Sequence, residues 1–157
     1  FADYNTWANK RLYDACATLP ETEYFEERPA FFRSIHGTLN HILVGDRIWL
    51  GRITGVDSGI TQLDAELYPD LASLRTARLE EDRRLAELVH GLGDDDLDRE
   101  YRYGTITFGS LGSRLHEMLA HLFNHQTHHR GQVHDQLSQT DVAPPSLDLM
   151  RMLRDRT

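Results

Sequence analysis

Four segments of this chain carry apolar residues at the spacing of an α-helix, and this pattern limits the possible folds more than any other feature. In the first segment, Tyr4, Ala8 and Leu12 follow the helical interval until Pro20 ends it. No run of residues shows the sustained alternation that is typical of a sheet core. We therefore predict helices at residues 3–19, at about 30–53, from a cap at Asp70 to a stop at Gly91 and Gly93, and from 110 to about 137.

The connections between these helices differ in length and composition. Residues 52–69 contain scattered glycines and polar residues and are predicted to form a long loop. Residues 101–108 alternate in a way that allows a short hairpin or an extended link. Ser146, which follows two prolines, is expected to cap a short helix through Leu153. The pattern predicts an all-α fold, a four-helix bundle with a longer crossover loop and a short C-terminal helix, in a single domain over residues 1–157.

Composition and charge exclude several classes of partner. The 157 residues include 17 Lys and Arg against 25 Asp and Glu, a formal charge of −8 with no basic stripe, so we expect no nucleic-acid partner. No apolar run approaches the roughly 20 residues that span a bilayer, so we expect no membrane segment. Cys16 is the only cysteine, which excludes an internal disulfide and agrees with a reducing compartment. We expect a cytoplasmic protein in which Cys16 is buried.

Four histidines lie within nine residues of the last long helix: His121, His125, His128 and His129. His125 and His129 are four residues apart, so their imidazoles project from one helical face on successive turns, as in a site where two side chains hold one divalent metal. The face that carries leucine and methionine earlier in this helix carries these two histidines here, which points them inward. An unsatisfied buried polar group costs roughly 1–3 kcal/mol, so two of them need a common ligand or partner.

The third ligand that this pair requires is predicted to be His41 in the second helix. His41 lies at the edge of the apolar stripe, Gly45 one turn later leaves space beside an imidazole, and His36 is expected on a more exposed side. Other arrangements stay open. His121 competes with His129 as the partner of His125, His128 is expected at the rim, and the histidines could instead form a hydrogen-bond network with Asp46 or backbone carbonyls.

Three neutral imidazoles would leave a coordination position for water or substrate, as in catalytic rather than structural sites. Imidazole suits several divalent metals, of which we predict zinc first and nickel second. Gln126 occupies the position at which a metalloprotease helix carries a general-base glutamate, which argues against peptidase chemistry. Asp46 is expected either to orient a ligand histidine by accepting its second N–H or to form an ion pair with Arg130 or Arg47.

Three motifs occur in order along the chain: Tyr-Asn-Thr-Trp-Ala-Asn at 4–9, Leu-Asn-His-Ile-Leu at 39–43 with Asp46 and Trp49, and Asn-His-Gln-Thr-His-His-Arg-Gly-Gln at 124–132. Together they resemble the DinB-like family of metalloenzymes over nearly the whole chain. The resemblance implies a four-helix bundle, usually dimeric, with a metal held by a histidine triad that carries over onto His41, His125 and His129. The wider superfamily includes thiol-dependent S-transferases and isomerases that use low-molecular-weight thiols such as bacillithiol or mycothiol.

The leading hypothesis is a metal-dependent S-transferase or hydrolase. In this hypothesis the metal activates a small thiol or water for attack on a small electrophilic substrate, and the protein is a homodimer. A second hypothesis is a non-catalytic metal- or ligand-binding module of a stress response, and a third is a purely structural bundle that serves in dimerisation. The residues expected to line the pocket or support the ligands are Tyr4, Asn5, Asn9, Asp46 and Gln132.

Overall fold

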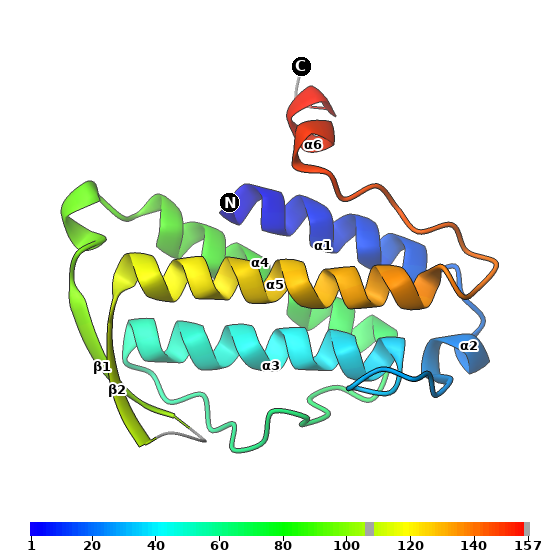
Figure 1. Ribbon diagram of the computed structural model, residues 1–157, viewed down its shortest axis with the longest axis horizontal. Coiled ribbons are helices and arrows are strands. Elements are labelled where there is room, and N and C mark those ends of the chain that lie inside the picture. Colours follow the sequence, from blue (N-terminus) through cyan, green and yellow to red (C-terminus); the bar gives the residue numbers. More distant parts are fainter. Residues whose placement is uncertain (106–108, 156–157) are drawn as a thin grey trace.

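The computed structural model describes residues 1–105 and 109–155 and confirms the predicted helical bundle (Figure 1). Four long helices form the bundle, and two short helices, a 3-10 turn and a two-stranded hairpin complete the described part of the chain. The elements are α1 (Ala2–Cys16), α2 (Glu21–Phe25), α3 (Ile35–Thr54), α4 (Leu71–His90), a 3-10 helix (Asp94–Asp96), β1 (Glu100–Thr105), β2 (Gly109–Arg114), α5 (Leu115–Leu137) and α6 (Leu149–Asp155).

The long helices run in two directions. α1 and α5 run one way and α3 and α4 the other, with α3 packed on α5 and α1 packed on α4 (Figure 1). Because α3 and α4 are parallel, the chain must return along the whole bundle between them, and residues 55–70 do so as the predicted crossover loop. Among the described residues, no helix is long and apolar enough to cross a membrane.

Side-chain caps explain where two of the long helices begin. Asp70 accepts a hydrogen bond from the backbone N–H of Ser73, which confirms it as the predicted cap of α4. The hydroxyl of Ser34 accepts from the backbone N–H of Gly37 in the same way. α3 therefore begins at Ile35 rather than near residue 30, and α1 ends at Cys16, three residues before the predicted end.

The predicted start of the last long helix is wrong. Residues 110–114 lie in β2, where Leu111 pairs with Tyr103 of β1, so the hairpin is the correct choice for this region. Gly109 has a positive φ of 74° that suits the turn, and the carboxylate of Glu117 accepts from the N–H of Arg114 to start α5 at the next residue. Apolar spacing continues across this boundary, which is why the strand was read as helix.

Two smaller predictions also need correction. The polar connection after α1 contains α2, which the sequence did not indicate. α6 begins at Leu149 rather than after Ser146, and it is the side chain of Asp148 that accepts from the N–H of Met150. Cys16 is 1% exposed, as predicted.

The bundle core contains a cluster of charged and amide side chains as well as apolar ones. Arg78 of α4 is 2% exposed and forms ion pairs with Asp46 of α3 at 2.5 Å and with Asp82 at 3.0 Å. Arg130 of α5 donates to amide side chains of α1 and α5. We call this set the buried charge network; its members are Asn5, Asn9, Asp46, Arg78, Asp82, Gln126 and Arg130.

Candidate metal centre

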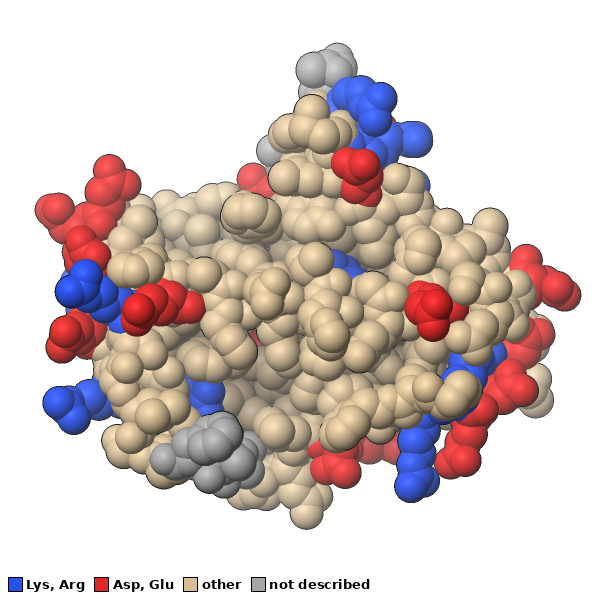
Figure 2. Space-filling view, in the orientation of Figure 1, with Lys and Arg blue, Asp and Glu red and all other residues tan. Residues whose placement is uncertain are grey.

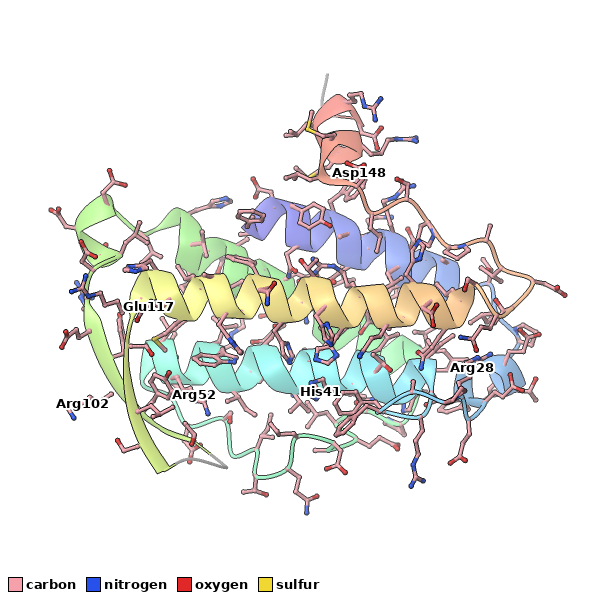
Figure 3. The ribbon with its side chains drawn as sticks, viewed as in Figure 1. Arg28, His41, Arg52, Arg102, Glu117 and Asp148 are labelled. Carbon is pink, nitrogen blue, oxygen red and sulfur yellow. The ribbon has the colours of Figure 1, made fainter. Side chains whose placement is uncertain are left out.

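Three imidazoles from two helices converge in the interior between α3 and α5. Nε2 of His41 lies 3.1 Å from Nε2 of His125 and 3.2 Å from Nε2 of His129. Among the described residues, these three form the group whose ligand atoms all lie close enough to hold one metal ion. Figure 3 labels His41 near the middle of α3. We call these three residues the histidine cluster.

Hydrogen bonds at the far side of two rings determine where their protons lie. The backbone carbonyl of Leu63 accepts from Nδ1 of His41 at 2.7 Å, and the side-chain oxygen of Gln132 accepts from Nδ1 of His129 at 2.7 Å. A neutral imidazole has only one N–H, so in both rings Nε2 is left with a lone pair. Both lone pairs point into the cluster, as they do in rings that bind a metal through Nε2.

All three rings are neutral at physiological pH. Burial, together with smaller contributions from the neighbouring histidines, lowers the pKa of His125 to about 3. Burial also lowers the pKa of His129 to about 4, against the opposing effect of Gln132, and lowers the pKa of His41. A neutral imidazole is the form that ligates a metal, so the site needs no change of protonation to bind one.

The spacing of the nitrogens fits a transition-metal site. Three nitrogens that lie about 2.0–2.1 Å from one tetrahedral Zn²⁺ are roughly 3.3 Å from one another. The two observed distances of 3.1 and 3.2 Å are close to this value. The donor set of three neutral imidazoles suits zinc, nickel, copper or iron and does not distinguish among them.

Close packing holds the rings in this arrangement. A Cβ at Gly45 would lie 2.5 Å from Cε1 of His125, so the glycine makes room for this ring. The sequence predicted space at Gly45, and the ring that uses it is His125 rather than His41. Phe32 stacks on His41 with the ring centroids 3.8 Å apart and lies edge-on to His129. Phe32 thus closes one side of the cluster.

A cavity of about 510 Å³ opens on another side of the cluster. It lies along α3 and beneath the hairpin, and its walls combine aromatic and aliphatic side chains with a few polar groups. On the face shown in Figure 2, the middle of the surface over α3 and α5 carries few charged side chains. The described residues that line the cavity are His41, Gly45, Ile48, Trp49, Arg52, Leu63, Tyr103, Thr105, Leu111, His121 and His125.

Of the residues predicted to support the ligands, Gln132 contacts the histidine cluster, and Tyr4, Asn5 and Asn9 do not line the cavity. The hydroxyl of Tyr4 donates to the backbone carbonyl of Leu147 at 2.7 Å. Asn5 and Asn9 belong to the buried charge network, where both donate to Asp82. Their motif at the start of the chain therefore serves the interior of the bundle.

Asp46 also belongs to the buried charge network, and its predicted partners are wrong. Its carboxylate pairs with Arg78 and accepts from the side chain of Gln126, rather than pairing with Arg130 or Arg47 or orienting a ligand histidine. Arg78 lies among the apolar residues on the buried side of α4. The sequence signal for this ion pair was an acidic residue in the apolar stripe of α3 and a basic residue in the apolar stripe of α4.

The other histidines lie outside the cluster. His36 was expected to be exposed but is 4% exposed, with Nδ1 3.0 Å from the hydroxyl of Tyr24 and Nε2 3.1 Å from the amide nitrogen of Asn40. His121 lines the cavity with its ring 4.6 Å from that of Trp49, and His128 is exposed beside Gln132. The choice of His41 over His36 and of His129 over His121 agrees with the observed grouping.

Two contributors to the site carried no signal in the sequence. Phe32 lies in the turn before α3, and Leu63 contributes a backbone carbonyl from the crossover loop. A carbonyl is present at every residue, and its position depends on the path of the loop. Neither residue has a side chain whose chemistry indicates a role at a metal site.

Comparison with known proteins agrees with this architecture. The family model described as "DinB family" matches residues 1–156. The chain belongs to the DinB family. A curated relative, Protein DinB of Bacillus subtilis (strain 168), is 26% identical over 150 residues, which cover 93% of this chain and 87% of that protein. Membership in the DinB family confirms the resemblance that the three sequence motifs indicated.

Proposed function

We propose that this DinB-family protein is a metal-dependent enzyme whose three histidines hold a divalent metal next to a substrate cavity. The reaction we infer is transfer of a low-molecular-weight thiol to a small electrophilic substrate, or hydrolysis of such a substrate. Zinc is the first choice of metal and nickel the second. When bound, the metal would act as a Lewis acid that lowers the pKa of a thiol or water.

The observation that carries this proposal is the contact between His41 and His129. Their Nε2 atoms lie 3.2 Å apart, and both carry lone pairs because each ring donates its one proton elsewhere. Two lone pairs at this distance repel, and a hydrogen-bonded network cannot satisfy the contact. His125 could donate to His41 alone and would leave the His41–His129 contact unchanged. A shared cation accounts for all three rings at once.

The surrounding residues support access to the metal from one side. Phe32 covers two of the rings, whereas His41 and His125 also form part of the cavity wall. With three protein ligands, a metal here would keep at least one position that faces the cavity, as catalytic sites do. This arrangement favours an enzyme over a closed structural site.

The nucleophilic thiol in this proposal must come from a cosubstrate. Cys16, the only cysteine, is buried in the apolar core, and burial raises its pKa to about 12. A thiol with such a pKa is protonated and unreactive at neutral pH. Cys16 is therefore excluded as the nucleophile, and a small thiol or water takes that part.

The test begins with elemental analysis of protein purified without an affinity tag. We expect about one equivalent of a single divalent metal per chain. That metal form is then assayed with a panel of low-molecular-weight thiols and electrophiles, and by hydrolysis without thiol. Turnover that disappears on chelation and returns with the same metal supports the enzyme. Stoichiometric metal with no turnover for any pair would favour the non-catalytic stress-response module instead, and absence of any bound metal would refute both.

The homodimer remains a prediction of the family resemblance. It is tested separately by measuring the mass of the protein in solution, because the histidine cluster is complete within one chain.

A further inference from the structure

Arg52 occupies the wall of the cavity near the end of α3, away from the histidine cluster. Its guanidinium carbon lies 4.5 Å from the ring centroid of Trp49 and 4.9 Å from that of Tyr103, so the cation packs against two aromatic side chains that also contact each other. Figure 3 shows Arg52 at the hairpin end of α3 and His41 farther along the same helix. This packing fixes the guanidinium at the cavity rather than in bulk solvent.

No acidic side chain of the described chain pairs with Arg52. The ion pairs within residues 1–105 and 109–155 do not include it, and burial lowers its pKa with only the nearby Tyr103 acting in the opposite direction. Residues 106–108 are Ile, Thr and Phe and carry no acid in their side chains. Arg47, one turn earlier on α3, differs in having Glu81 as its partner. Arg52 is thus a partly buried cation without a counter-charge from the protein.

The spacing along α3 relates Arg52 to the histidine cluster. His41, Gly45, Ile48 and Arg52 follow one another at intervals of four, three and four residues, so they share one face of the helix, and all four line the cavity. Gly45 lies against His125, and Arg52 is seven residues farther on, a rise of about 10 Å. Because the side chain of Arg52 lies over Trp49, it turns back toward the cluster and shortens this span.

We propose that Arg52 binds an anionic group, a carboxylate, of a small molecule whose apolar body fills the cavity. Trp49, Ile48 and Leu111 would contact the body of this molecule, and its opposite end would face the histidines. Among the described residues lining the cavity, Arg52 is the only Lys, Arg, Asp or Glu, so it is the group that selects the charge of the ligand. A planar guanidinium binds a carboxylate through two parallel hydrogen bonds.

This inference deepens the proposed function, since it assigns a class of substrate to the same site. The carboxylate could belong to the electrophile or to the thiol cosubstrate, because both would enter this cavity. Either source predicts the same contact with Arg52.

Binding of a simple probe tests the contact without requiring catalysis. The probe is 3-phenylpropanoate, which joins an apolar ring to a carboxylate, and the comparison compounds are 3-phenylpropanamide and 3-phenylpropylamine. Isothermal titration should show that the protein as purified binds the acid more tightly than the amide and the amine least. Arg52→Gln should weaken binding of the acid by about tenfold or more and leave the amide unchanged, since hydrogen bonds to charged groups contribute more than neutral ones.

Two controls keep this result interpretable. Arg102→Gln removes an exposed arginine from the neighbouring strand β1 that does not line the cavity, and it should not change affinity for the acid. Arg52→Lys keeps the charge without the paired geometry and should give an intermediate loss, which guards against a folding defect in Arg52→Gln. Equal affinities of wild type and Arg52→Gln for the acid would overturn the proposal, as would a wild type that binds amide and acid alike.

Metal removal separates this proposal from the proposed function. A carboxylate could also ligate a metal, so the titrations are repeated after chelation. If the effect of Arg52→Gln persists in the chelated protein, Arg52 binds the anion whether or not the enzyme hypothesis holds. If affinity for the acid depends on the metal and not on Arg52, the carboxylate binds at the histidines and the proposal is wrong. If the enzyme is active, KM is measured for the thiol and for the electrophile. The substrate whose KM rises in Arg52→Gln is the one that carries the carboxylate.

Discussion

The bundle interior holds two polar clusters that differ in whether the protein pairs opposite charges within them. They lie on adjacent residues of α5: Gln126 and Arg130 enter the buried charge network, whereas His125 and His129 enter the histidine cluster. In the network, the Arg78 cation lies between the carboxylates of Asp46 and Asp82. In the histidine cluster, the Nε2 lone pairs of His41 and His129 face one another, and none of the described residues places a proton or a cation between them.

From this difference we predict that one cluster stabilises the fold and that the other binds a ligand. The network joins all four long helices, because its members come from α1, α3, α4 and α5. The histidine cluster brings together nitrogens from two of these helices, α3 and α5. A change in the network should therefore cost stability, and a change in the cluster should cost metal binding.

The largest expected effect is on metal binding in the histidine cluster. His125→Ala and His129→Ala should each abolish stoichiometric metal binding, because two imidazoles make only part of a site. His134→Ala, a histidine in the last turn of α5 outside the cluster, is the matched control and should retain full occupancy. Elemental analysis after dialysis measures the metal content of each variant.

Thermal unfolding of the metal-free forms extends the same comparison. His129→Ala should unfold close to wild type once metal is removed. If instead it loses as much stability as a network variant, the two clusters do not differ in the way described.

The next largest effect is on stability, at Arg78. Arg78→Met should lower the free energy of unfolding by about 3–5 kcal/mol, since it leaves two buried carboxylates without their cation. Arg83→Met, which removes an exposed arginine of the same helix that pairs with Glu80 and Glu87, should have little effect. Urea unfolding of the metal-free proteins measures both. A small effect at Arg78 would mean that water or rearrangement satisfies these acids.

A smaller effect on metal binding is expected at Gly45, which lies against the ring of His125. Gly45→Ala should displace the ring of His125, because the added Cβ would lie 2.5 Å from Cε1. We expect metal affinity to fall about 10–100-fold, the range found when the support of a ligand is disturbed. Gly131→Ala adds the same methyl group at a position of α5 with no described atom within 4 Å, and metal affinity should not change. Competition with a chelating dye measures both, and equal affinities would show that the ring has room to move.

The two clusters also differed in how well the sequence predicted them. His125 and His129 share a face by local helical spacing, so their pairing could be read directly from the chain. The addition of His41 required a choice among several histidines, and Gly45 helped to make it. The buried charge network joins four helices, and its contacts depend on which face of each helix packs against which neighbouring helix. The packing of helices against one another depends on the whole fold and not on local sequence. The sequence therefore indicated that Asp46 needs a partner but did not identify Arg78 as that partner.

The same distinction explains the errors in the fold. The long helices were predicted from the local spacing of apolar residues and from capping residues, and Asp70 caps α4 as expected. The boundary at residue 115 was missed because Leu111 continues the apolar spacing of α5 while it lies in a strand. Strand pairing between β1 and β2 decides the conformation there, and pairing is a contact between segments rather than a property of either one.

The last predicted effect is the pH dependence of the stability of the metal-free protein, and it again separates the clusters. Burial lowers the pKa of His125 to about 3 and of His129 to about 4 in the folded chain, against 6.5 as the ordinary value. Between these values the unfolded chain binds more protons than the folded one, so the stability present above pH 6.5 is lost as the pH falls toward 4.

The double variant His125→Asn, His129→Asn isolates this contribution to stability. At pH 5, unfolding of the wild type should take up about two more protons than unfolding of the double variant, one for each histidine. The slope of unfolding free energy against pH, from urea titrations in the presence of a chelator, measures this difference, and His134→Ala should keep the wild-type slope. Identical slopes in the double variant and wild type would mean that these imidazoles are hydrated in the metal-free protein. The lone-pair contact between His41 and His129 would then be relieved by water, and the argument that a cation must bind there would lose its basis.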